Sequence, residues 1–174
     1  AVFARRKWRI FRKRIITGSL YPRMNLNTLR NGEDIFRGNF RFFGMLQAIE
    51  GEHVIWLGDG KNTVSAELFN VDIYILPPSD SMPHPEDIIK NRALQTGDMP
   101  RRIRWSALHS LPEGTRFFLS GPLFFDKRKP VFRSEKDNQL LVVIYDGKEQ
   151  DLLNSSICAA RQRNEYWNSI TYPS

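Results

Sequence analysis

The chain has 174 residues, of which 41% are hydrophobic and 26% are charged. These values are typical of a globular domain and exclude disorder over the whole length, and no apolar run reaches the roughly 18 residues of a membrane span. The single cysteine, Cys158, excludes a disulfide framework and a cysteine-based zinc site, so we predict one β-rich domain with tails.

The positive charge is concentrated near the start of the chain. The formal net charge is +7, and seven of the ten residues from 5 to 14 are basic. Without these seven, the chain has 19 basic and 19 acidic residues, and the first acidic residue is Glu33. The excess charge therefore belongs to this basic arm (residues 5–14) rather than to the domain as a whole.

Three hypotheses explain the basic arm. It binds an anionic membrane surface, or it binds nucleic acid through counterion release, or it is a solvated tail. Apolar side chains interleaved with the cations, such as Trp8, Ile10 and Phe11, favour the lipid interface. We predict that eight residues of the arm contact a membrane or another anion: Arg5, Arg6, Lys7, Trp8, Arg9, Arg12, Lys13 and Arg14.

The first residues also suggest where the domain is located. The chain opens with Ala1 rather than Met, and these residues lack the apolar region of a signal peptide. We expect a processed product with a transmembrane helix upstream, because Lys and Arg cluster on the cytoplasmic flank of such helices. This places the domain at the cytoplasmic face of a membrane, and the lone cysteine agrees with a reducing compartment.

The elements that follow are mostly strands. Residues 1–38 hold the arm, with a short amphipathic helix over 8–15, and a turn-rich segment that wraps the domain. Alternating or continuous apolar patterns predict strands that turn signals separate, and Pro122 either ends the fifth strand or makes it an edge strand. The predicted strands cover residues 39–49, 53–57, 63–69, 71–76, 115–121, 130–132 and 140–145.

Two helical regions complete the prediction. Residues 77–110 form an insertion, with a helix over about 85–94 and a short extended piece over 101–108. Asp151 caps a closing helix over 152–167. The predicted organisation is therefore an arm and wrapping segment at 1–38, a β-barrel at 39–148, and a C-terminal helix and tail at 149–174.

This strand order resembles an OB-fold, a five-stranded Greek-key barrel with a helix between its third and fourth strands. The resemblance rests on Arg41-Phe42-Phe43-Gly44, with Gly44 at the bend of the first strand, and on the segments 54–60, 64–68 and 111–121. The fold class predicted is mostly β: a small OB-like Greek-key barrel with an inserted helix and a C-terminal helix.

The chain is also similar to membrane-tethered OB-like domains, those of NfeD-type proteins and of mitochondrial GIDE-type ubiquitin ligases. In these families the barrel sits beside transmembrane helices, which agrees with the basic arm. The Cys and His residues that a RING ligase needs are missing here, so the resemblance does not imply ligase activity. It implies no functional residue either.

The sequence contains no recognisable motif for catalysis or metal binding. His53, His84 and His109 lack metal-ligand spacing, and no phosphate-binding glycine motif or carboxylate pair is present. We expect no cofactor and no enzyme activity, and we do not expect a small-molecule ligand. An enzyme whose site the sequence hides is kept as a third hypothesis.

The aromatic residues leave two alternatives open. One member each of Phe42-Phe43 and Phe117-Phe118 must point out of the barrel, to form a binding platform or to lie under the terminal segments; we favour coverage. The best candidate for a ligand or nucleic-acid surface combines aromatic and basic side chains: Phe124, Phe125, Lys127, Arg128 and Lys129.

Two functions therefore lead. The first is a non-catalytic binding or scaffolding domain of a membrane-anchored protein, with a protein partner that the sequence does not identify. The alternative is a single-stranded nucleic-acid-binding protein that uses the basic arm and the 124–129 loop.

Overall fold

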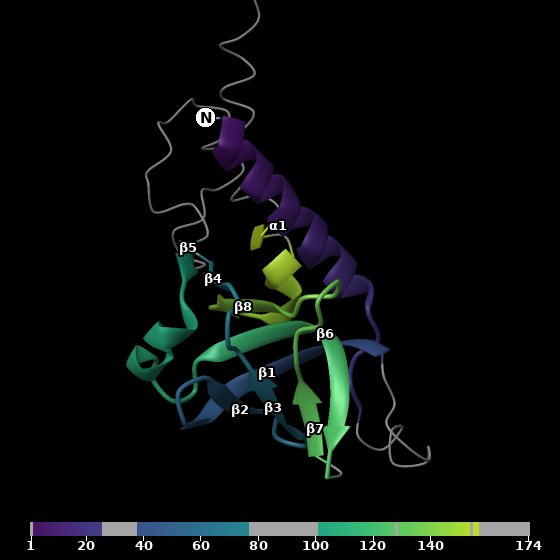
Figure 1. Cartoon of the computed structure of the whole chain (residues 1–174), viewed down its shortest axis with the longest axis vertical. Coiled ribbons are helices and arrows are strands. Elements are labelled where there is room, and N and C mark those ends of the chain that lie inside the picture. Colours follow the sequence, from purple (N-terminus) through teal and green to yellow (C-terminus); the bar gives the residue numbers. More distant parts are fainter. Residues whose placement is uncertain (1, 26–37, 77–100, 128, 154, 157–174) are drawn as a thin grey trace, which may run out of the picture.

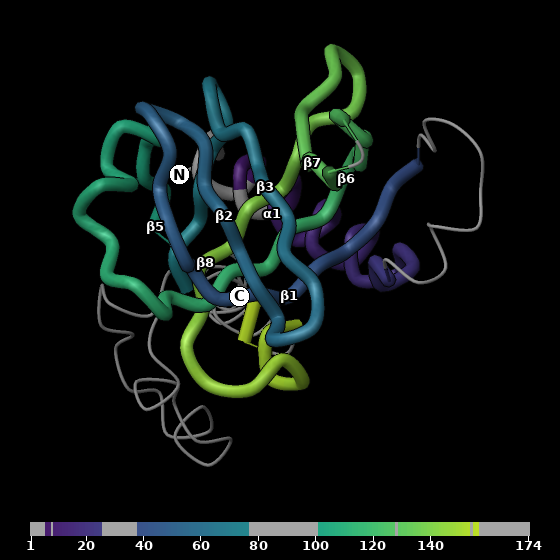
Figure 2. The backbone as a smooth tube through the Cα atoms, turned by 90° about the horizontal axis from the view of Figure 1, so that it is seen from below, coloured from purple at the N-terminus to yellow at the C-terminus, as the bar shows by residue number. Residues whose placement is uncertain are grey.

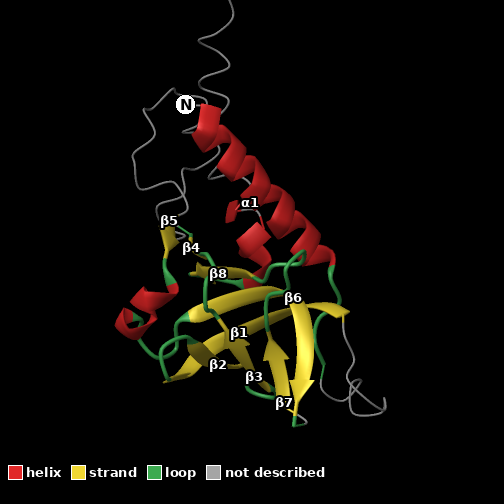
Figure 3. Ribbon diagram, viewed as in Figure 1, coloured by secondary structure: helices red, strands yellow, loops and turns green. Residues whose placement is uncertain are grey.

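The computed structural model describes residues 2–25, 38–76, 101–127, 129–153 and 155–156 (Figure 1). The side chains of residues 2–5 and 8 lie outside this description. Figure 3 distinguishes the helices from the strands. The elements are α1 (Val2–Leu20), β1 (Gly38–Glu50), β2 (Val54–Gly58), β3 (Thr63–Glu67), β4 (Ile73–Ile75), β5 (Arg101–Ile103), the 3-10 helix η3 (Trp105–Ser110), β6 (Arg116–Asp126), β7 (Lys129–Phe132) and β8 (Leu141–Tyr145).

Five strands close into a barrel in the order β1-β2-β3-β7-β6, and the pairing of β6 with β1 completes the ring (Figure 2). All neighbours are antiparallel except β3 and β7, which are parallel. This arrangement is compatible with an OB-like barrel, and it confirms the predicted fold class. Inward side chains such as Phe42, Leu57 and Phe132 are fully buried and fill the interior.

The first strand serves two neighbours in succession. Residues 38–45 of β1 pair with β6, and residues 45–50 pair with β2. Gly44 stands where the partner changes, and a Cβ there would lie 2.5 Å from the ring of Phe42. The missing side chain at Gly44 therefore lets the strand turn without displacing the core.

Three more strands extend the sheet from the edge of β6 that faces away from β1, in the order β8, β4, β5. The apolar run that forms β8 is buried on both faces. Val142 and Ile144 face the barrel core, while Leu141, Val143 and Tyr145 face a second hydrophobic cluster. This alternation explains why β8 lacks the polar positions of a half-exposed strand.

The second cluster lies under α1 and the helical residues 149–153 and 155–156. Phe11 and Ile15 of α1 are fully buried there, together with Phe118 of β6 and Leu152. Phe43 packs against the same cluster. The structure thus confirms coverage, since the outward members of both phenylalanine pairs lie under the terminal segments.

The N-terminal segment is more ordered than the predicted short helix over 8–15. α1 has 19 residues, and Figures 1 and 3 show its N-terminal half extending beyond the strands. The following residues do wrap the barrel: Met24 is buried, its N–H donates to the Arg41 carbonyl at 2.9 Å, and Arg41 donates back to the Pro22 carbonyl. The sequence did not indicate the full length of the helix, because cations occupy the positions beside its buried residues.

Two local predictions are wrong, and one of the two alternatives for Pro122, the end of the strand, is excluded. β6 continues through Pro122 to Asp126, because its neighbour changes there from β8 to β7 and no strand on that side requires the missing N–H. The extended piece ends at Ile103, and η3 follows. The closing helical segment begins at residue 149, so Asp151 lies inside its first turn rather than at its cap.

The other predicted helical regions are not described. The helix over 85–94, most of the 77–110 insertion, and residues 157–174 of the C-terminal helix and tail lie outside the described residues.

We predict that the domain loses stability at alkaline pH, because the second cluster contains the buried Tyr145. Burial raises the pKa of Tyr145 to about 12, with a smaller contribution from the Glu149 carboxylate. An unfolded tyrosine ionises near pH 10, so between pH 10 and 12 the folded state holds a proton that the unfolded state has lost. We expect the free energy of unfolding to fall across this window, as measured by urea titration.

Tyr145→Phe tests the assignment, because it removes the ionising group and keeps the ring. The variant should show a shallower alkaline decline than the wild type. Some decline should remain, since burial also raises the pKa of Tyr74. Identical pH profiles for the two proteins would rule out a contribution from Tyr145.

Candidate functional site

The exposed side of α1 carries cations and aliphatic residues on one line. Helical spacing puts Arg6, Arg9, Lys13, Ile16 and Leu20 on the face opposite the buried Phe11 and Ile15, and all five are exposed. This outward stripe is basic in its N-terminal half and aliphatic in its C-terminal half.

The apolar part of the stripe is unusual for this surface. Five large hydrophobic residues are exposed in the described part of the chain, and three of them, Ile10, Ile16 and Leu20, lie on α1. Leu20 is 81% exposed. Single exposed apolar residues are normal, but their grouping beside cations on one helix is typical of a contact surface.

Not every cation of the basic arm is available for such a contact. Arg6, Lys7, Arg9 and Lys13 are exposed, whereas Arg12 and Arg14 are half-buried. Arg14 donates to the carbonyl oxygens of Gln139 and Leu140 at 3.1 and 3.0 Å. These bonds fix α1 to the loop before β8, so Arg14 has a structural role that the prediction of a uniform arm missed.

Two residues of the predicted arm cannot be placed in this way. The side chains of Arg5 and Trp8 lie outside the described residues, although both positions belong to α1.

A second surface lies on the outside of the barrel, across β2, β3, β7 and β6. The strand registers put Trp56, Ser65, Val131 and Phe124 side by side in one row, which we call the aromatic row. The Lys129 ammonium lies 5.6 Å from the centre of the Trp56 ring. Both ends of the row are therefore aromatic, with a cation beside the Trp56 end.

The other end of the row also carries a cation. The Arg133 guanidinium lies 5.8 Å from the centre of the Phe124 ring, within the range of a cation–π contact. Arg133 also makes a two-pronged ion pair with Glu67, with N–O distances of 2.6 and 2.8 Å. The hydrogen bonds to Glu67 raise the pKa of Arg133. The two-pronged pair also positions the guanidinium beside the Phe124 ring.

The structure separates the residues that the sequence grouped at 124–129. Phe124 and Lys129 belong to the outer face, whereas Phe125 packs against the barrel core. Lys127 is exposed in the hairpin turn with a φ of 48°, and Arg128 lies outside the described residues. Successive side chains of a strand point to opposite faces of the sheet, which explains why the adjacent Phe124 and Phe125 lie on different faces.

Sequence reasoning missed Trp56 and Arg133 as members of this surface. The signal for Trp56 was present, because it alternates with the buried Ile55 and Leu57 along β2. Arg133 gave no such signal, since its place beside Phe124 depends on the pairing of β6 with β7.

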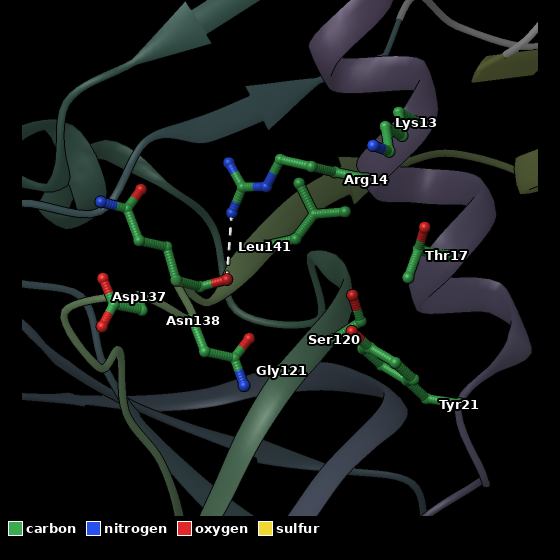
Figure 4. Close-up of a pocket in the computed structure, with 10 residues that line it drawn as sticks. Lys13, Arg14, Thr17, Tyr21, Ser120, Gly121, Asp137, Asn138 and Leu141 are labelled. Carbon is green, nitrogen blue, oxygen red and sulfur yellow. Dashed lines mark hydrogen bonds between the residues drawn. The ribbon is translucent and has the colours of Figure 1, made fainter.

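A small pocket lies between α1, β6 and the loop that precedes β8 (Figure 4). Its volume is about 230 Å³. The lining side chains are largely polar, and two of them are cationic. They are Lys13, Arg14, Thr17, Tyr21, Ser120, Asp137, Asn138 and Gln139, with Gly121 and Leu141 completing the wall.

Within the described part of the chain, no helix combines the length and apolar character that a membrane crossing requires. The same residues include no group of three or more His, Cys, Asp or Glu side chains arranged to hold a metal ion.

Comparison with known proteins adds no family. Neither a protein-family model, nor a curated protein, nor a solved structure matches this chain.

Proposed function

We propose that this chain is a non-catalytic binding or scaffolding domain that α1 holds against the cytoplasmic face of an anionic membrane. The outward stripe of α1 carries the proposal, because it presents cations and aliphatic side chains together. Each Lys or Arg near an anionic surface contributes about 1 kcal/mol of attraction, and the aliphatic residues add burial at the headgroup boundary.

The attachment of α1 to the barrel supports the same proposal. Phe11 and Ile15 are fully buried, so a contact made by the outward stripe fixes the orientation of the whole domain. The resemblance to NfeD-type and GIDE-type domains belongs to this proposal, since an OB-like barrel lies beside a membrane in those families. The aromatic row would then remain free for a protein partner.

Vesicle co-sedimentation tests the proposal. We expect the chain to bind phosphatidylcholine vesicles that contain phosphatidylglycerol and to ignore vesicles of phosphatidylcholine alone. Binding should weaken as salt is raised, because screening shortens the reach of the exposed cations. Equal recovery with both kinds of vesicle would refute an electrostatic membrane contact.

A second candidate function is the binding of single-stranded nucleic acid, and the aromatic row favours it. Neighbouring strands are about 4.8 Å apart, so Trp56 and Phe124, three strands apart, are separated by roughly 14 Å along the row. Bases stack on accessible aromatic rings, and the Lys129 ammonium beside Trp56 supplies positive charge for the backbone.

Alanine substitutions on the row test this candidate. Trp56→Ala and Phe124→Ala should each weaken oligonucleotide binding by about tenfold, since stacking contributes roughly 1–3 kcal/mol per base. Phe69→Ala is the matched control, because Phe69 is an exposed aromatic residue outside the row. Fluorescence anisotropy with labelled oligothymidine measures the change, and equal effects of all three substitutions would exclude the row as the site.

A further inference from the structure

The pocket between α1, β6 and the loop before β8 is the strongest unassigned feature of the described residues. We infer that it binds a phosphate oxyanion, either on a lipid headgroup or as free inorganic phosphate. The lipid form rests on the membrane function proposed above, whereas the free form does not. This inference departs from the sequence-based expectation that no small molecule binds.

The positive charge of the pocket is the first argument. Arg14 donates to two neutral carbonyl groups, and it belongs to none of the three ion pairs found among the described residues. Its charge is therefore held in position without an ion pair, although Asp137 lines the same pocket. Lys13, from the preceding position of α1, adds a second cation to the lining.

Ser120 is the second and independent argument. Three serines are buried in the described part of the chain, and the hydroxyls of Ser65 and Ser156 each donate to a backbone carbonyl. The Ser120 side chain is 3% exposed and lines the pocket, yet no described group hydrogen-bonds its hydroxyl. The hydroxyl lines the pocket, so it can donate a hydrogen bond to an oxyanion bound there.

The pocket is formed by close packing of separate segments. A Cβ at Gly18 would lie 2.1 Å from the Ser120 Oγ, so α1 lies too close to β6 at this point for any residue larger than glycine. Gly121 adopts a φ of 150° and lies against Leu140. These two contacts fix the positions of the helix, the strand and the loop around the pocket.

The size and the other polar groups point to a small anion. A volume of about 230 Å³ lies below the roughly 300–1,000 Å³ of pockets for drug-sized ligands. Figure 4 shows the Arg14 side chain running toward Gln139, on the side of Asp137 and Asn138, with Thr17 and Ser120 on the opposite side of the pocket. Asp137 is exposed and carries a negative charge like that of the anion, so it should weaken anion binding without preventing it.

A phosphate titration of the ¹⁵N-labelled full chain tests the site. We expect saturable amide shifts confined to residues 13–21, 120–121 and 137–141, and none with chloride at the same ionic strength. Lys13→Gln should weaken phosphate binding by about tenfold, and Asp137→Asn should strengthen phosphate binding by about threefold. Lys7→Gln is the matched control, because it removes the same charge from α1 outside the pocket.

Vesicles distinguish the two sources of phosphate. We compare phosphatidic acid with phosphatidylglycerol in phosphatidylcholine vesicles of matched surface charge. A preference for phosphatidic acid that Lys13→Gln abolishes and Lys7→Gln retains identifies a lipid headgroup as the ligand. Saturable inorganic phosphate binding without this preference identifies free phosphate.

Phosphate shifts that do not saturate, or that weaken equally in Lys7→Gln and Lys13→Gln, would overturn the site. The membrane proposal would survive that outcome if the wild type still bound phosphatidylglycerol vesicles. If vesicle binding fails and phosphate saturates, the site stands and the membrane proposal falls.

Discussion

Replacing Phe11 with Ala is expected to lower the free energy of unfolding by about 3–5 kcal/mol. Phe11 is fully buried in the second hydrophobic cluster, and its ring centre lies 4.6 Å from that of Tyr74. The substitution removes a large side chain from between α1 and the sheet. Domains of this size are stable by only about 5–15 kcal/mol, so urea denaturation should show an obvious shift of the midpoint.

Ile16→Ala is the matched control for this prediction. Ile16 lies on the same helix but is exposed, so its replacement should change stability by no more than about 0.5 kcal/mol. If Phe11→Ala has as small an effect as Ile16→Ala, then α1 is not part of the cooperative fold. The proposal that it orients the domain would lose its basis.

Neutralising the basic half of the outward stripe should have a comparably large effect on membrane binding. The triple variant Arg6→Gln, Arg9→Gln, Lys13→Gln is expected to bind anionic vesicles roughly a hundredfold more weakly. The loss follows from about 1 kcal/mol for each cation near the surface. Vesicle co-sedimentation over a range of lipid concentrations measures the partition constant.

A second triple variant separates a located surface from net charge. Lys61→Gln, Lys136→Gln, Lys148→Gln removes the same charge from exposed positions outside α1. We expect this variant to retain most of the wild-type affinity. A comparable loss in the two triple variants would mean that overall charge, and no particular face, governs the binding.

The barrel was predictable from sequence because its strands carry local signals. The alternation in β1, the glycine turn between β2 and β3, and the unbroken apolar run of β8 all depend on neighbouring residues. Pro122 misled the prediction, since its tolerance depends on β6 changing neighbours at that point.

The length of α1 and the candidate sites were less accessible. The buried stripe of α1 is short, and three cations, Arg12, Lys13 and Arg14, separate Phe11 from Ile15, so the sequence predicted only the short helix over 8–15. The pocket joins Arg14, Ser120 and Asp137, which are more than a hundred positions apart from first to last. Only tertiary packing brings them together, and no local pattern marks Ser120 as lacking a partner.

The most direct test of the central claim is to measure which face of the domain meets the lipid. An environment-sensitive fluorophore is attached at Ile16→Cys or, as the control, at Lys61→Cys, each in a Cys158→Ser background because Cys158 is the native cysteine. With phosphatidylglycerol vesicles, the account predicts a blue shift and quenching by a lipid-soluble quencher at position 16, and neither change at position 61. An unchanged spectrum at position 16, or equal changes at the two positions, would contradict a membrane contact made by α1.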